Sequence, residues 1–447
     1  MKQINAGAAI PAILLMILFA SWSSAQTGKI ENISEQASLV TEFEVNGLKV
    51  LLKRREAAPT VAVGLFIKGG SRNIDPKTAG IEHLTLNSAV EAGKKFPREA
   101  ARREASRSGS SISAAAGPDF SAISLASTRQ SFDRMWNVFI DVTLNPTFAS
   151  PDVERVRQLI ITTLRESEIS PDAALESLEQ RVVYSGHPYA NDVQGSIKTV
   201  GSFTPDQLRA YHTGLMQTSR LLLVVVGDLD PDDLRSRVAA SFGKLPRGSY
   251  KDETYPALNF STPTLDIVPR NLQTNYIKGV FEAPSLSLPD YYPMRVAITI
   301  LQQLVNEEVR TRRQLSYAPN AELSTLAANT ANIYVTAVDA NQAVSVMLDQ
   351  INALKTRAVS QDNIDGMMGQ FLTQYYLQQE TNASQVIELA RYELIGGGWR
   401  RSFEFLNRIR EVKSKDIRDV SEKYMKNIRF VVVGNQLAIK RSIFVPE

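Results

Sequence analysis

The spacing of apolar residues divides the first half of the chain into short strands and amphipathic helices. Short apolar runs bounded by turn residues predict strands at residues 43–45, 48–53, 61–67, 110–116 and 120–126. Apolar positions three and four apart predict helices at about residues 79–92, from Pro97 onward, and at about 131–144, 151–168, 171–184 and 204–214. The continuous apolar run at residues 221–227 predicts a buried strand after the last of these helices. This order of elements indicates an α+β fold.

A pattern near residue 220 recurs near the C-terminus. Met216 is followed four residues later by Arg220 and then by an apolar strand that ends in Gly227. Met425 is likewise followed four residues later by Arg429 and by an apolar strand. A helix that begins near an aspartate precedes each copy. We therefore predict two homologous modules of roughly 200 residues in tandem.

The module boundaries follow from the stretch between the two copies. Residues 245–263 contain Pro, Gly, Ser and Tyr with little periodicity, which is typical of a linker. We predict an N-terminal module at 38–245, a linker at 246–262 and a C-terminal module at 263–447. The glycines at 396–398 lack the Lys-Ser/Thr of a phosphate loop, so we interpret them as the end of a helix.

The N-terminus has the features of an export signal. Lys2 precedes an almost wholly apolar stretch at residues 6–20, and small residues follow at 23–25. We predict a signal peptide at residues 1–25, cleaved after Ala25, and a periplasmic or secreted mature chain that has no membrane segment. A retained membrane anchor is the alternative, disfavoured by Pro11 within the apolar run. With no cysteine in the chain, export would occur without disulfides or a lipidated cysteine.

Charge adds little to this picture. The chain has 50 Lys and Arg residues against 47 Asp and Glu residues, so its net charge of +3 gives no indication of a nucleic-acid or an anionic-membrane partner, and we expect no membrane partner after signal cleavage. One basic run has two glutamates interleaved at helical spacing, and consists of Arg98, Glu99, Arg102, Arg103, Glu104 and Arg107. We interpret it as a solvated helix face stabilised by i,i+4 ion pairs rather than as a phosphate-binding patch.

Candidate metal ligands are scarce. The chain has three histidines and no cysteine, too few for an ordinary three-ligand zinc site unless carboxylates dominate. We expect His187 to be a loop residue beside a turn proline and His212 to lie on the polar side of a helix. His83 is more informative, because a second histidine four residues later and a glutamate before it would create a zinc-peptidase helix. Those positions hold Asn87 and Leu86, and leucine can neither bind a metal nor accept a proton.

These residues, in their order along the chain, resemble the pitrilysin/insulinase family of zinc metallopeptidases, in its short-chain, processing-peptidase-like branch. The resemblance covers about residues 38–440 and rests on several short motifs, namely Gly69-Gly70-Ser71-Arg72, Gly80-x-x-His83, Gly186-His187-Pro188-Tyr189, Val226-Gly227-Asp228, and Val309-Arg310 with Leu315-Ser316-Tyr317. It implies two pitrilysin-like modules that form half of a clam-shell chamber.

The resemblance also implies that most of the zinc site is missing. Active members hold zinc with His-x-x-Glu-His and a glutamate on a later helix. His83 matches the first histidine, Leu86 replaces the general base and Asn87 replaces the second ligand. The distal glutamate aligns with Thr162 and Thr163, and the family's Asn-Ala beside the substrate strand aligns with Ser113-Ala114. We therefore expect this chain to bind no metal.

The second module departs less from the family. Active complexes take an Arg and a Tyr seven residues apart from a C-terminal module, and Arg310 and Tyr317 match that pair. An arginine can fix a substrate carbonyl and a tyrosine hydroxyl can stabilise an oxyanion. The alternative interpretation places Arg310 in a surface arginine cluster with Arg312 and Arg313, and Tyr317 at the start of a strand.

The resemblance thus favours a non-catalytic subunit of a heteromeric zinc peptidase that takes peptides as substrate. Zinc is expected in a paralogous partner, in a heterodimer, to whose site this chain contributes Arg310 and Tyr317 in trans; a homodimer is the other possible assembly. The alternatives are an inactive scaffold resembling the core proteins of respiratory complex III, and an autonomous peptidase with a rebuilt metal site. The shortage of ligands makes the last the weakest.

Overall fold

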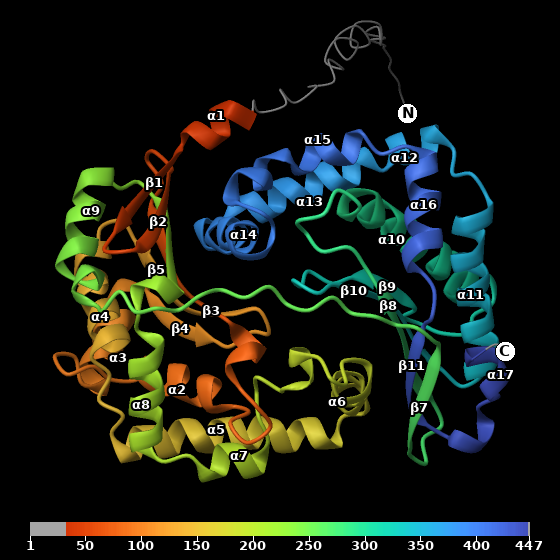
Figure 1. Ribbon diagram of the computed structural model, residues 1–447, viewed down its shortest axis with the longest axis horizontal. Helices are drawn as coiled ribbons and strands as arrows, with labels where there is room; N and C mark the ends of the chain where they lie inside the picture. Colours follow the sequence, from red (N-terminus) through yellow and green to blue (C-terminus); the bar gives the residue numbers. More distant parts are fainter. Residues whose placement is uncertain (1–32, 446–447) are drawn as a thin grey trace, which may run out of the picture.

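The computed structural model describes residues 33–445, and the expected signal peptide lies outside the described residues. The first module contains a six-stranded sheet in the order β1-β2-β6-β3-β5-β4 (Figure 1). Its strands are β1 (Val40–Val45), β2 (Leu48–Arg54), β3 (Thr60–Lys68), β4 (Ser111–Ala115), β5 (Phe120–Thr128) and β6 (Leu221–Gly227). Its helices are α1 (Ile33–Ser38), α2 (Ile81–Ala89), α3 (Arg98–Ser108), α4 (Phe132–Leu144), α5 (Ser150–Ile169), α6 (Pro171–Val183), α7 (Ile197–Ser202), α8 (Pro205–Leu215) and α9 (Pro231–Ala240).

The second module contains a five-stranded sheet in the order β7-β11-β8-β10-β9. Its strands are β7 (Thr264–Pro269), β8 (Asn275–Glu282), β9 (Asn320–Leu323), β10 (Thr330–Ala337) and β11 (Arg429–Gly434). Its helices are α10 (Tyr291–Val305), continued by a π-helical turn (Asn306–Arg312), α11 (Ala340–Thr356), α12 (Gln361–Gly366), α13 (Met368–Glu380), α14 (Asn382–Ile395), α15 (Phe405–Arg410), α16 (Ser414–Tyr424) and α17 (Arg441–Phe444). Short 3₁₀ turns lie at Gly70–Asn73, Pro188–Ala190, Thr218–Arg220, Phe242–Lys244, Trp399–Glu404 and Gln436–Ala438.

The two sheets share one topology. β2 pairs in parallel with β6, as β7 does with β11. The remaining strands, β6-β3-β5-β4 in one sheet and β11-β8-β10-β9 in the other, pair antiparallel. β1 is an addition at the edge of the first sheet. The prediction of two homologous α+β modules is confirmed, and the predicted elements of the first half agree with the observed ones apart from their ends.

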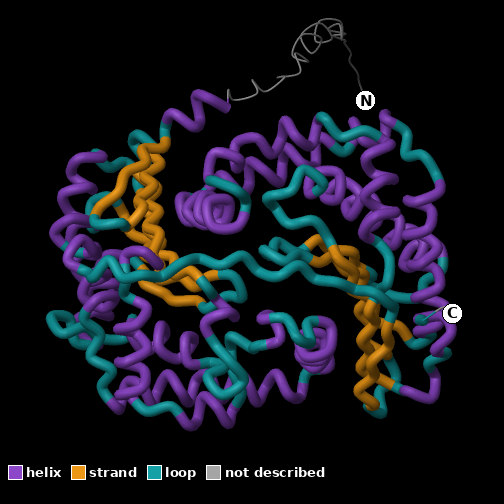
Figure 2. Tube along the Cα trace, in the orientation of Figure 1, coloured by secondary structure: helices purple, strands orange, loops and turns teal. Residues whose placement is uncertain are grey.

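Each module covers one face of the other module's sheet. The outer face of the first sheet packs on its own helices, including α4, through residues such as Phe139 and Leu223. Its other face packs on α14 of the second module, where Val386 and Leu389 contact a core that includes Phe66. In return, α6 places Leu175 and Leu178 in a core with strands of the second sheet. Figure 2 shows helices on both sides of each sheet, so the two modules interlock.

Ion pairs accompany both crossing helices. Glu393 of α14 accepts from Lys49 of β2 at 2.6 Å, and Glu179 of α6 accepts from Lys278 of β8 at 2.6 Å. The Glu179–Lys278 pair is the more enclosed, and burial raises the pKa of Glu179 more than Lys278 lowers it. These pairs hold the two modules in register.

The chain between the modules crosses from one to the other without a helix or strand at residues 246–263 (Figure 1). Both repeat arginines stack on it. The Arg220 guanidinium lies 4.7 Å from the centroid of the Tyr250 ring, and that of Arg429 lies 4.1 Å from Phe260. The two arginines of the sequence repeat therefore hold the connecting segment at both ends.

The end of α14 and the apolarity of the helices complete the description of the fold. Gly396 ends α14, as expected of the glycines at 396–398, and the Gly398 N–H donates to Tyr392 O at 2.9 Å. Among residues 33–445, no helix is both long and apolar enough to span a bilayer.

Candidate functional site

Helix α2 carries the residues that correspond to the zinc motif. Gly80 precedes the helix with φ of 86°, and a side chain there would meet Gln194 O at 2.9 Å, so the entry turn requires glycine. His83 is half-buried on this helix. Burial lowers the pKa of its imidazole, an effect that a hydrogen bond with the Gln194 side chain only partly offsets. Its Nδ1 is buried and has no hydrogen-bond partner among the described residues.

The next two motif positions have structural roles. The Leu86 side chain is fully buried and belongs to the apolar core under the first sheet. The Asn87 Nδ2 donates to the His83 carbonyl at 2.9 Å, one helical turn back. Leu86 therefore serves core packing and Asn87 a hydrogen bond within the helix.

Thr162 and Thr163 lie on α5, which packs against α2 through a core that includes Leu84 and Ile160. Both threonines are exposed. Their hydroxyls donate to the carbonyls of Gln158 at 2.8 Å and Leu159 at 3.2 Å. The two helices pack together, and over residues 33–445 no group of three His, Asp or Glu side chains has the geometry to hold a metal.

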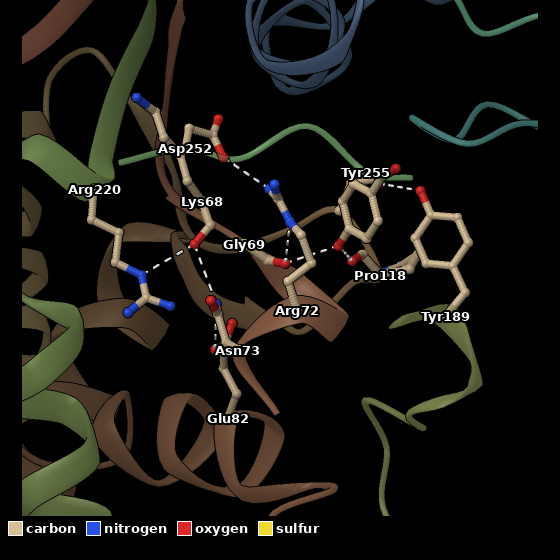
Figure 3. A network of polar contacts seen from close by, with 11 residues as sticks. Lys68, Gly69, Arg72, Asn73, Glu82, Pro118, Tyr189, Arg220, Asp252 and Tyr255 are labelled. Atoms are coloured by element: carbon tan, nitrogen blue, oxygen red, sulfur yellow. Dashed lines mark hydrogen bonds and ion pairs between the residues drawn. The ribbon is translucent and has the colours of Figure 1, made fainter. Parts of the chain in front are cut away.

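Glu82 has a role that the sequence analysis missed. Its carboxylate is 3 % exposed and accepts hydrogen bonds from the Tyr211 hydroxyl at 2.6 Å, from Asn73 Nδ2 at 3.4 Å and from the Ser121 hydroxyl. These bonds tie α2 to α8, to β5 and to the turn after β3. Figure 3 shows the bond between Asn73 and Glu82. The sequence offers one indication of this buried carboxylate, namely an acidic residue among the apolar positions at the start of a helix.

The other histidines do not contribute to a metal site. His187 lies before Pro188 as expected, and its Nε2 is 3.1 Å from Pro256 O. The expectation for His212 was wrong, because its side chain is 5 % exposed rather than on a polar face. Its Nε2 lies 2.9 Å from Thr143 O and its ring packs on Phe148. Burial lowers the pKa of both histidines.

The Gly69–Arg72 motif anchors the connecting segment to the first module. The Arg72 guanidinium donates to Asp252 at 2.8 Å and lies 4.2 Å from the centroid of the Tyr255 ring. The Tyr255 hydroxyl in turn donates to the carbonyls of Gly69, at 2.8 Å, and Pro118 (Figure 3). This motif is therefore part of the module junction.

At the same junction the two equivalent hairpin turns meet. Asp119, in the turn between β4 and β5, accepts hydrogen bonds from the Tyr189 hydroxyl and from the Ala327 N–H at 3.1 Å. Ala327 and Ala328 lie in the corresponding turn between β9 and β10, and the Ala328 N–H donates to the Tyr189 oxygen at 3.2 Å. Burial raises the pKa of Asp119 to about 6, against smaller lowering effects of these hydrogen bonds. Asp119 also lines a cleft of about 370 Å³ between the modules.

Arg310 and Tyr317 form an exposed pair in the second module. Arg310 lies in the π-helical turn after α10, and its guanidinium is 4.5 Å from the centroid of the Tyr317 ring. Tyr317 is 80 % exposed and precedes β9, so it does not begin a strand. Arg312 and Arg313 bind Glu307 and Glu308. Arg310 forms no ion pair with any residue in the described range, which separates it from its arginine neighbours.

Strand β4 offers an unpaired edge beside α2. Within residues 33–445 it is the last strand of the first sheet and pairs only with β5, and its residues alternate between exposed and half-buried. Ser113 and Ala114 lie in its centre. An extended peptide can extend such a sheet by main-chain hydrogen bonds.

Comparisons with known proteins agree with this geometry. The family model described as insulinase (peptidase family M16) matches residues 49–196, and the one described as peptidase M16 inactive domain matches residues 202–394. An uncharacterized zinc protease of Rickettsia felis is 22% identical over 391 residues, which cover 86% of this chain and 94% of that protein. Subunit 1 of the bovine mitochondrial cytochrome b-c1 complex is 22% identical over 259 residues, covering 57% of this chain and 54% of the subunit.

A solved structure places the fold in the same group. The periplasmic protease PqqL from Escherichia coli superposes with a TM-score of 0.72 at 16% sequence identity. The match covers 90% of this chain but 48% of PqqL, so the two modules described above correspond in length to about half of that protein.

Proposed function

Because the chain belongs to the insulinase family of peptidases (peptidase family M16), we propose that it is the non-catalytic subunit of a periplasmic heteromeric zinc peptidase. A paralogous subunit binds the zinc. This chain supplies one half of a clam-shell chamber, together with Arg310 and Tyr317, which act on peptide bound at the partner's metal. The correspondence in length between this chain and half of PqqL supports the half-chamber.

The replaced zinc motif supports the non-catalytic assignment. Leu86 lies in the core, while Asn87, Thr162 and Thr163 bond to the carbonyls of their own helices. Of the residues aligned with the motif, His83 alone keeps a metal-binding side chain, and one imidazole cannot replace the three protein ligands of a catalytic zinc. Water activation therefore has to come from another chain.

The exposed, stacked arrangement of Arg310 and Tyr317 is the single observation that carries the proposed contribution in trans. Among the described residues the Arg310 guanidinium has no anionic partner, and its stacking on Tyr317 leaves its N–H donors free for a substrate carbonyl or carboxylate. The Tyr317 hydroxyl is exposed and can donate to the oxyanion that forms when a peptide carbonyl is attacked.

Reconstitution with the zinc-bearing paralogue tests this assignment. Tyr317→Phe should leave assembly and zinc content unchanged and lower kcat about 10²–10³-fold, the usual effect of deleting one oxyanion donor. Arg310→Ala should lower kcat/KM by weakening substrate positioning. Arg312→Ala and Tyr376→Phe are matched controls, because both residues are exposed and lie outside the pair. Full kcat/KM in the Arg310→Ala/Tyr317→Phe double variant, with the complex intact, would reject the contribution in trans.

Localisation is a separate part of the proposal. Residues 1–25 act as a signal peptide, so the mature protein should be found in the periplasmic fraction with Gln26 as its first residue. N-terminal sequencing of the exported protein tests the cleavage site. A chain that keeps residues 1–25 and remains with the membrane fraction would support the anchor instead.

A scaffold is the second candidate, favoured by the similarity to bovine cytochrome b-c1 complex subunit 1. In that case the chain forms a stable complex, as a heterodimer or a homodimer, that cleaves no peptide. Co-purification from the native periplasm, with zinc counted per chain, separates the two. One zinc for every two chains, together with peptidase activity, supports the shared enzyme, whereas a zinc-free, inactive complex supports the scaffold.

A further inference from the structure

Residues 94–107 carry a concentrated positive charge. The segment contains two carboxylates and six cations, a net charge of +4, whereas the whole chain carries +3. The rest of the chain therefore has a net charge of −1. The cations are Lys94, Lys95, Arg98, Arg102, Arg103 and Arg107, and the carboxylates are Glu99 and Glu104.

Helix α3 (Arg98–Ser108) carries the four arginines, and the two lysines precede it. It begins after Pro97 and ends before Gly109, which adopts φ of 58° and stops the helix. Ala101 and Ala105, one turn apart, pack against the core of the first module. Arg102, Arg103 and Arg107 of this helix are exposed. Figure 1 shows α3 beside α4 on the outer side of the module.

The expected i,i+4 ion pairs on this helix do not form, so that prediction was wrong. Glu99 binds the preceding Arg98 at 2.9 Å, and Glu104 binds Arg134 of α4. Arg98 also binds Glu91 at 3.2 Å. Five exposed cations are left without an ion pair to any described residue, namely Lys94, Lys95, Arg102, Arg103 and Arg107. We call these five residues the α3 basic face.

We propose that the α3 basic face binds the surface of an anionic phospholipid bilayer. The exposed large apolar side chains of the described chain all lie outside residues 94–107. A protein interface is normally centred on buried apolar or aromatic residues, and single-stranded nucleic acids are bound by stacking on aromatic side chains. A layer of lipid phosphates needs neither, since each flexible cation can reach a separate headgroup.

The binding should be peripheral and sensitive to salt. Each cation near an anionic membrane surface strengthens binding about fivefold, and this effect falls off within one Debye length, about 10 Å at 0.1 M salt. Removing three of the five charges should therefore weaken binding about 100-fold. This proposal does not depend on the peptidase-subunit function, because it concerns a surface of this chain alone.

Co-sedimentation with vesicles tests the proposal on the full chain. Vesicles of phosphatidylcholine with 30 mol% phosphatidylglycerol are compared with pure phosphatidylcholine, at 50 and 300 mM NaCl. The triple variant Arg102→Gln/Arg103→Gln/Arg107→Gln should lose about 100-fold in affinity for the anionic vesicles at 50 mM NaCl. The control Lys77→Gln/Lys198→Gln/Arg418→Gln removes the same charge from exposed, scattered sites and should stay within about threefold of the wild type.

The design separates the α3 basic face from other causes of binding. Any affinity of the apolar residues 6–20 for bilayers is common to all three proteins and should not depend on phosphatidylglycerol. Equal losses in the two triple variants would overturn the proposal, because net charge alone would then explain the binding. It would equally be overturned if binding were independent of phosphatidylglycerol, or if poly-glutamate or duplex DNA were bound but anionic vesicles were not.

Discussion

The carboxyl group of Asp119 offers a quantitative test of the contact between the modules. It is 6 % exposed, accepts hydrogen bonds from Tyr189 and from the Ala327 N–H, and forms no ion pair within the described residues. The nearby Arg72 is bound to Asp252. Burial without a countercharge raises the pKa of Asp119 from an ordinary 3.8 to about 6. The ionised carboxylate is thus less favourable in the folded protein than in the unfolded chain.

The sign and size of the effect follow from this pKa. Since the folded-state pKa lies above the unfolded one, the stability associated with protonated Asp119 is full below about pH 4 and is lost as pH rises through about 6. Each pKa unit corresponds to about 1.4 kcal/mol, so ionisation costs at most about 3 kcal/mol at pH 8. Asp119→Asn removes that cost but exchanges one acceptor for a donor. We therefore expect the variant to be more stable than the wild type by about 1–3 kcal/mol at pH 8, and this advantage should be about 2 kcal/mol smaller at pH 4.5.

Urea unfolding followed by tryptophan fluorescence at pH 4.5, 6 and 8 measures this difference. Asp75→Asn is the control, because Asp75 is fully exposed and hydrogen bonds from Thr78 and Lys77 lower its pKa. Its variant should lose stability above about pH 4, which is the opposite sign. If Asp119→Asn shows the same difference from wild type at pH 8 as at pH 4.5, the buried carboxylate carries no such cost and the reasoning is refuted.

Two further predictions concern the core and the zinc motif. Leu389 of α14 is 2 % exposed and packs against the first sheet. Leu389→Ala should therefore lower the free energy of unfolding by about 2–5 kcal/mol. Because this residue joins the two modules, amide exchange should accelerate in both sheets. Faster exchange confined to the second module would contradict the interlocked packing. Leu86→Glu with Asn87→His should bind no stoichiometric zinc by mass spectrometry of the metal, because the distal glutamate is still absent. It should also lower the melting temperature, because Leu86 is fully buried. One tightly held zinc per chain would contradict this.

Local pattern predicted the elements but not their partners. Strand β6 is predicted correctly because six apolar residues in a row, followed by Gly227, suit a strand buried on both faces. The repeat was recognised because Met216 and Met425 end equivalent helices before equivalent strands. Helical periodicity shows that α14 has an apolar face, but it contains no information on which sheet that face covers. The exchange of α6 and α14 between modules was therefore beyond the reach of the sequence.

In the candidate site, too, the sequence predicts residue types but not the partners of the side chains. The loss of metal ligands at Leu86 and Asn87 followed from residue type alone. The roles of Glu82 and Asp119 did not, because their hydrogen-bond partners lie up to 129 and 208 residues away in the chain. For the glutamates of α3, the arginines nearest in sequence are the wrong ion-pair partners, since Glu104 binds Arg134 of α4.

The two halves of the predicted site differ in what they contribute to folding, and this difference bears on function. Leu86 is aligned with the general base of active family members. Its side chain packs in the core, where its burial stabilises the fold. Arg310 and Tyr317 are both exposed and contact each other, so they contribute little to folding. The π-helical turn that carries Arg310 is an irregularity often found at functional sites. The role proposed for the pair therefore rests on contacts outside this chain, which the Tyr317→Phe reconstitution tests.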